Sequence, residues 1–261
     1  MAELDGRPVT LDELQSLALT NYGHFTSMRM ENGTIRGLSL HLDRLVRDCR
    51  LVFGVELDRE KTLSYIRQAA AGVSGVAGVR VTVFDPAIDM GRPGEAQDPH
   101  VLVHLRPASA TPPPPLTAKS FTFTRDNAAV KHIGLYSQLR VRREAQRAGF
   151  DDAVFVEPDG RVSEGSTWNL GFVDQDGTVI WPDAPVLPGT TMLLLQSLGL
   201  TEQVTAPVRL VDVPGMAAAF ATNTTIGVRS VSALDDVEFP QDHSVLDALR
   251  DGYARIPGDK L

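Results

Sequence analysis

A proline-rich segment constrains the fold of this chain more than any other feature. Residues 107–115 read Pro-Ala-Ser-Ala-Thr-Pro-Pro-Pro-Pro, so five of nine residues are proline. Proline lacks the backbone N–H that helix and sheet interiors need, and consecutive prolines favour an extended chain. The segment therefore predicts a stiff connector between two folded parts. We expect a small N-terminal α/β domain over residues 1–106, a linker over 107–117 and a larger C-terminal mixed α/β domain over 118–261.

Local patterns before the connector predict helices alternating with strands. Thr10 and Glu13 have the spacing of a capping box at a helix start. Asn32-Gly33 is typical of a tight hairpin turn, because both residues tolerate positive φ. Apolar residues at helical spacing then predict a helix with Ser39 as its N-cap. The remaining expected elements are a helix after Asp58 and strands over 25–30, 79–84 and 100–105.

Local patterns after the connector mix hairpins with helices. Asp159-Gly160 and Asp176-Gly177 predict turns between strands, and Gly199 is expected to end an apolar helix. This mixture predicts the α+β class and argues against a doubly wound parallel sheet. The expected helices cover 135–148, 192–198 and a segment after His243, and the expected strands lie near 120–124, 153–156, 161–163, 168–173, 178–181, 219–222 and 227–231.

Charge and cysteine content restrict the partners and the compartment. A net charge of −8 argues against broad nucleic-acid binding, which needs a basic face. The single cysteine, Cys49, excludes an internal disulfide framework and fits a reducing compartment. No apolar stretch has the length of a membrane helix, and the acidic start Met1–Asp5 lacks the features of a signal peptide. We expect a cytoplasmic protein that binds small molecules, with no metal site and no nucleic-acid or membrane partner.

Four features could carry chemistry, although each alone has a simpler explanation. Lys131 follows an apolar run, and a partly buried lysine can become a nucleophile; alone it reads as a surface lysine. Glu164 follows a strand and alone reads as a solvated loop acid. Residues 187–191 form a glycine-containing helix start, which attracts phosphate, and Arg44 could bind phosphate from a helix. Together they offer an amine, a carboxylate and an anion site, which an aldehyde cofactor with a pyridine ring and a phosphate requires.

The order and spacing of these features resemble the class IV aminotransferase family, fold type IV of the pyridoxal-5′-phosphate (PLP) enzymes. This family includes branched-chain and D-amino acid aminotransferases and aminodeoxychorismate lyases. The resemblance covers about residues 23–231. The matching segments are His41-Leu-Asp-Arg-Leu45, Lys131-His-Ile-Gly-Leu-Tyr136, Val162-Ser-Glu-Gly-Ser-Thr-Trp-Asn169, Leu187-Pro-Gly-Thr-Thr191 and, more loosely, Ala221-Thr-Asn-Thr-Thr225.

The resemblance implies a role for each matched residue. Lys131 would hold PLP as a Schiff base and transfer the proton, and Glu164 would pair with the pyridine nitrogen. Tyr136 would lie near the phenolic oxygen of the cofactor. The phosphate would be bound by Arg44, Thr190, Thr191 and Thr224. The family also implies a homodimer.

Four departures from the family pattern concern the substrate side, and one of them is that Leu-Gly follows Asn169 in place of the usual aromatic residue. Leu135 replaces an asparagine that often precedes the tyrosine, and Met192 stands where an arginine usually follows the L-P-G-x-T threonine. Known D-amino acid enzymes carry an arginine where this chain has Val83 or Phe84, which argues against a D-amino acid carboxylate site.

The resulting hypothesis is a PLP-dependent aminotransferase that exchanges an amino group between an amino acid or amine and a keto acid or ketone. Two alternatives remain open at this point. A lyase of the aminodeoxychorismate type would use the same cofactor residues, and a PLP-binding protein without catalysis would need only the binding residues.

Overall fold

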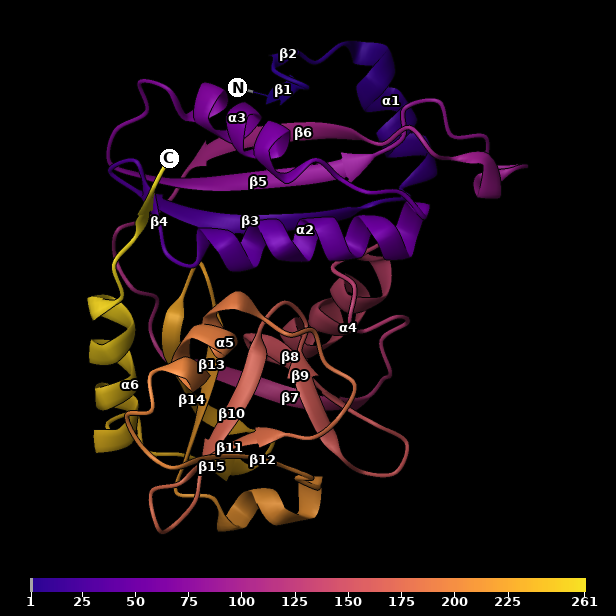
Figure 1. The fold of residues 1–261 in the computed structure, drawn as a ribbon. Helices are drawn as coiled ribbons and strands as arrows, with labels where there is room; N and C mark the ends of the chain where they lie inside the picture. The colour runs from indigo at the N-terminus through magenta and orange to yellow at the C-terminus, as the bar shows by residue number, and fades with distance from the viewer. Residues whose placement is uncertain (1) are drawn as a thin grey trace. The chain divides into compact units, whose positions relative to one another are not determined.

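The computed structural model describes residues 2–261, which form two compact units, each with its own sheet (Figure 1). Unit 1 comprises the residues up to Ala110 together with Val130–Gly134 and Pro257–Leu261. Unit 2 comprises Thr111–Ala129 and Leu135–Ile256.

Unit 1 is built on an antiparallel sheet of seven strands. The strands are β1 (Ala2–Leu4), β2 (Arg7–Pro8), β3 (His24–Glu31), β4 (Thr34–Ile35), β5 (Val76–Phe84), β6 (His100–Pro107) and β16 (Asp259–Lys260), in the order β16-β4-β3-β5-β6-β1-β2. The helices are α1 (Leu11–Thr20), α2 (Leu38–Phe53) and α3 (Arg59–Ala70), with a 3₁₀ turn, η1, at Pro93–Glu95. Figure 1 shows α2 running along β3. Its apolar residues recur every three or four positions, so one face of α2 joins α3 and alternate residues of the strands in a common core.

Unit 2 contains a mixed sheet that closes on itself. Its strands are β7 (Leu116–Thr122), β8 (Asp152–Val156), β9 (Val162–Gly165), β10 (Asn169–Val173), β11 (Val179–Pro182), β12 (Gln203–Ala206), β13 (Ala218–Asn223), β14 (Gly227–Leu234) and β15 (Val237–Glu238). Their order is β12-β11-β10-β13-β14-β7-β8-β9, and β9 also pairs with β10. This extra pairing closes the six strands from β10 through β9 into a ring around an apolar core. The helices are α4 (Tyr136–Arg147), α5 (Thr190–Ser197) and α6 (Ser244–Arg255), with a 3₁₀ segment, η2, at Leu210–Gly215.

Two local predictions are confirmed by the backbone. Thr10 and Glu13 form the complete capping box at the start of α1. Asn32 and Gly33, with φ of 50° and 76°, connect β3 to β4. None of the helices in residues 2–261 is long and apolar enough to cross a membrane.

The prediction that Ser39 caps α2 is wrong. The helix begins at Leu38, and its N-cap is Gly37 with φ of 68°. The side chain of Asp259 accepts a hydrogen bond from the Leu38 N–H at 3.1 Å. The acceptor for the helix start therefore comes from a residue more than 200 positions later, which local sequence cannot reveal.

The units differ from the sequence-based domains in two segments. Their division between Ala110 and Thr111 lies within 107–117, although β6 extends to Pro107 and β7 begins at Leu116. Val130–Gly134 and Pro257–Leu261, which were expected in the C-terminal domain, belong to unit 1. The reason is backbone pairing: the first segment pairs with β3, and the second forms β16 on β4.

A buried carboxylate, Asp152, ties α4 to the turn between β9 and β10. It accepts hydrogen bonds from Nε and Nη2 of Arg142 at 3.0 and 2.6 Å and from Nε1 of Trp168 at 2.9 Å. The Ser166 hydroxyl donates to the same carboxylate. One side chain therefore satisfies several donors near the end of β9, where Glu164 lies.

Replacing Asp152 by alanine should destabilise unit 2 strongly. The loss should be about 3 kcal/mol, the lower end of the range for breaking a buried ion pair, because Arg142 is partly exposed while the Ser166 and Trp168 donors stay buried without their acceptor. The control is Asp159→Ala, which removes an exposed pair with Arg161 and should cost about 1 kcal/mol or less. Urea unfolding followed by tryptophan fluorescence reports on unit 2, which contains both tryptophans. Equal losses in the two variants would contradict this role of Asp152.

Candidate active site

Lys131 is fixed in unit 1 by hydrogen bonds to both its backbone N–H and its backbone carbonyl. Its N–H donates to Oδ2 of Asp48 at 3.0 Å, and its carbonyl accepts from the N–H of Phe25 at 2.8 Å. Ile133 N–H donates to the carbonyl of Gly23 at 3.0 Å, so the segment runs beside the start of β3. The Lys131 Nζ lies 4.9 Å from the centroid of the Phe25 ring. These contacts fix where the Lys131 side chain starts.

Arg44 is buried on α2, one turn before Asp48. Its Nη2 donates to the Thr26 hydroxyl at 2.5 Å and lies 3.4 Å from Nδ1 of His41. Burial lowers the pKa of Arg44 to about 10, so the guanidinium remains charged at neutral pH. Among residues 2–261 its Nε has no hydrogen-bond partner, and no carboxylate forms an ion pair with it. A buried cation with an unused donor favours an anionic ligand.

Two buried histidines next to this arginine are uncharged at neutral pH. Burial, with the nearby charges of Arg44 and Arg47, lowers the pKa of His24 to about 3. Burial also lowers the pKa of His41 well below its ordinary value, and the charges of Arg44 and Lys131 add to this effect. Arg44 and Lys131 therefore lie near the same imidazole, and together they make this part of unit 1 cationic.

Glu164 is buried at β9 in unit 2, and both of its carboxylate oxygens accept hydrogen bonds. Oε1 accepts from Nη1 of Arg125 at 2.7 Å. Oε2 accepts from the Leu187 N–H at 3.2 Å and from Nδ2 of Asn169 at 3.5 Å. These donors set the orientation of the carboxylate and connect it to the loop that precedes α5.

The loop before α5 depends on a close approach between Gly189 and Asn169. A Cβ atom on Gly189 would lie 2.0 Å from Oδ1 of Asn169, so only glycine fits at this position. The Asn169 side chain also donates to the Leu187 carbonyl at 2.7 Å. Thr190 and Thr191 are buried as the first residues of α5, where a helix presents N–H donors suited to an anion.

The two remaining predicted residues lie in different surroundings. Thr224 is half-buried in the turn between β13 and β14. Tyr136 is the first residue of α4, and its side chain is 76% exposed. Two positions before Thr224, Thr222 is fully buried, and its hydroxyl has no hydrogen-bond partner among the described residues.

The structure thus arranges the predicted residues in two groups, each within one unit. Unit 1 brings together Arg44 and Lys131. Unit 2 brings Glu164 to the loop that leads to Thr190 and Thr191, whereas Tyr136 is an exposed residue at the start of α4. Sequence reasoning missed Asp48, Arg125 and Thr222. The sequence could have indicated two of them, because Thr222 lies inside the matched segment 221–225 and Asp48 lies one helical turn after the matched segment 41–45. The sequence around Arg125 matches no family motif.

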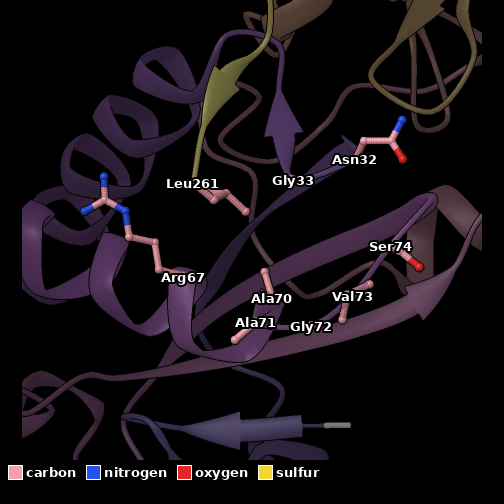
Figure 2. A pocket seen from close by; sticks show the side chains of 9 residues that line it. All are labelled: Asn32, Gly33, Arg67, Ala70, Ala71, Gly72, Val73, Ser74 and Leu261. Carbon is pink, nitrogen blue, oxygen red and sulfur yellow. The ribbon is translucent and has the colours of Figure 1, made fainter.

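A pocket elsewhere in unit 1 contains none of these residues. Figure 2 shows this cavity of about 450 Å³, which is lined by the Asn32-Gly33 turn, Arg67, residues 70–74 and Leu261. The only charged side chain among its lining residues is that of Arg67. It does not provide the amine and carboxylate that the proposed chemistry needs.

The two groups supply complementary chemistry. The unit 1 group offers a primary amine and a buried guanidinium, which suit an aldehyde and a phosphate. The unit 2 group offers an oriented buried carboxylate, which suits a protonated ring nitrogen. The unused Nε of Arg44 is the feature that fits a phosphate-bearing group best.

Solved structures of aminotransferases have the same fold. The branched-chain amino acid aminotransferase of Escherichia coli superimposes with a TM-score of 0.86 at 18% identity, covering 100% of this chain and 95% of the other. A PLP-bound hypothetical aminotransferase from Mycobacterium tuberculosis gives a TM-score of 0.80 at 19% identity and 97% coverage of both chains. The expected α+β, fold type IV architecture is confirmed.

Curated relatives match over a shorter range. Probable branched-chain-amino-acid aminotransferases of Rickettsia bellii and Rickettsia felis are each 29% identical over 124 residues, which is 44% of this chain. The match spans 42% of the length of these relatives.

The family assignment rests on a longer match. The sequence pattern of the family described as "Amino-transferase class IV" matches residues 23–234, which include every predicted site residue. The resemblance found in the motifs is thereby confirmed, and the chain belongs to the class IV aminotransferase family.

Proposed function

We propose that this protein is a PLP-dependent aminotransferase that exchanges an amino group between an amino acid or amine and a keto acid or ketone. The observation that carries the proposal is the buried Arg44 beside the backbone-anchored Lys131, in a chain of this family. Membership of the family supports the reaction class. The named relatives support amino acids and keto acids as substrates, with branched-chain amino acids as the first to test.

The proposed cofactor residues come from both groups. When bound, PLP supplies an aldehyde that condenses with amines and a ring that accepts electrons from the carbon next to the amine. Lys131 would hold the aldehyde carbon, Arg44 would bind the phosphate, and Glu164 would pair with the ring nitrogen. Thr190, Thr191 and Thr224 would add hydrogen bonds to the phosphate.

Each residue of the chain has a separate task in this proposal. The Lys131 amine would act as a general base and acid: it would take the proton from the α-carbon of the substrate and deliver it to the carbon derived from the cofactor aldehyde. Arg125, Asn169 and the Leu187 N–H would keep the Glu164 carboxylate in one orientation. The role of Tyr136 near the phenolic oxygen rests on the family resemblance alone.

The test is a panel of L-, D-, (R)- and (S)-amines with pyruvate and 2-oxoglutarate as acceptors. Transfer of the amino group to a keto acid, lost in Lys131→Ala, would support the proposal. Release of pyruvate and p-aminobenzoate from aminodeoxychorismate without amino transfer would identify a lyase instead. Bound PLP whose absorbance does not respond to any amine would identify a binding protein.

Two variants should separate chemistry from cofactor binding. Glu164→Gln should retain PLP but lose at least about tenfold in kcat, because an amide stabilises a protonated ring nitrogen poorly. Arg44→Ala should weaken PLP binding by about 1.5–3 kcal/mol, the range for a hydrogen bond to a charged group. Saturating PLP should then restore much of its rate. A Glu164→Gln enzyme with wild-type kcat, or an Arg44→Ala enzyme with unchanged affinity, would remove that residue from the site.

We also propose that the protein is a homodimer in the cytoplasm. Family resemblance and the frequency of two-fold dimers among soluble enzymes support the dimer. The buried, unpaired Cys49 is consistent with a reducing compartment. Light scattering at micromolar concentration should give a mass near twice 28.3 kDa, and an active species of 28.3 kDa would contradict the dimer.

A further inference from the structure

We propose that Asp48 is a positioning residue, which fixes the backbone of Lys131 at a set distance from Arg44. The proposal rests on the proposed function, because it concerns how these two residues are placed to bind one cofactor. It adds a residue that neither the motifs nor the comparisons assign.

The Asp48 carboxylate is buried and fully used. Its side chain is 1% exposed, and Oδ2 accepts the hydrogen bond from the Lys131 N–H at 3.0 Å. Oδ1 accepts from Nε and Nη2 of Arg47 at 2.9 and 2.6 Å. The charge needed to bury this carboxylate therefore comes from its neighbour Arg47, and the second oxygen is committed to the lysine backbone.

Helix geometry links this contact to the arginine. Arg44 and Asp48 are four residues apart on α2, so they lie on the same face, and both are buried. Four residues correspond to about 6 Å along a helix axis. Because an α-helix is rigid over this length, the spacing between Arg44 and Asp48 is constant. The same helix therefore carries the cation for the phosphate and the acceptor that fixes the lysine.

The hydrogen bonds of the Lys131 segment attach it to two different elements. The Phe25 N–H binds the Lys131 carbonyl, and Ile133 binds Gly23, so both of these bonds attach the segment to β3. The bond to Asp48 attaches Lys131 to α2. The bond therefore sets the position of the lysine relative to the helix that bears Arg44.

The carboxylate also acts on Arg44 through its charge. Burial lowers the pKa of Arg44, and the nearby carboxylate of Asp48 opposes that effect. Asp48 thus helps to keep the guanidinium charged while the hydrogen bond places the lysine. If Asp48 served only as the ion-pair partner of Arg47, neither its bond to the Lys131 N–H nor its proximity to Arg44 would be needed.

Amide hydrogen exchange of the PLP-free protein tests the positioning directly. In the wild type, the Lys131 amide should be protected. Asp48→Ala should speed its exchange by about tenfold, the effect of losing one hydrogen bond to a charged group. Asp48→Asn keeps an acceptor oxygen and should restore most of the protection. The control Arg47→Lys keeps a cation beside Oδ1 and leaves the bond to Lys131, and it should stay near the wild type.

A second measurement is the rate at which the protein captures added PLP, monitored by the absorbance of PLP. This rate should be highest in the wild type, lower in Asp48→Asn and lowest in Asp48→Ala. If wild-type protein captures no PLP, the proposed function is refuted. The hydrogen-exchange result then still tests whether Asp48 fixes the Lys131 backbone. If wild-type protein captures PLP and Asp48→Ala captures it equally fast, the positioning role is refuted. An unprotected Lys131 amide in the wild type would refute it as well, even if Asp48→Ala does not fold.

Discussion

The placement of Lys131 depends on a short segment that joins unit 1 from far along the chain. Residues 131–133 pair with the start of β3, and the Lys131 N–H bonds to Asp48 on α2. These bonds attach Lys131 to α2, one helical turn from the buried Arg44, which is 87 positions earlier in the sequence. A buried guanidinium whose Nε has no hydrogen-bond partner among the described residues favours an anionic ligand, and Lys131 is held one turn away from it.

Charge is distributed between the two groups in a way that matches one kind of ligand. In unit 1 the buried histidines are neutral, and the positive charge of Arg44 is buried beside them. In unit 2 the buried carboxylate of Glu164 is oriented by Arg125 and the Leu187 N–H. A phosphate and an aldehyde complement the unit 1 arrangement, and a basic ring nitrogen complements the unit 2 arrangement. This complementarity is the physical basis for the proposed cofactor.

Sequence patterns predicted those features that short stretches determine. The capping box at Thr10, the Asn32-Gly33 turn and the family motifs all depend on residues close together in the chain. The cap of α2 by Asp259 and the transfer of residues 130–134 to unit 1 depend on tertiary contacts, so they could not be predicted. The same holds for Arg125, whose partner Glu164 is 39 positions away. The family motifs were enough to predict the candidate site residues. The hydrogen bonds that fix their positions connect distant parts of the chain and are visible only in the structure.

The central claim is that Lys131 is the residue that binds the cofactor. The chain has four lysines, Lys61, Lys119, Lys131 and Lys260, so the claim can be tested site by site. The most direct measurement is borohydride reduction of the PLP-loaded protein, followed by peptide mass spectrometry. The account predicts one phosphopyridoxyl group per chain, located on Lys131. A modification located on another lysine, or no modification of a protein that contains bound PLP, would contradict it.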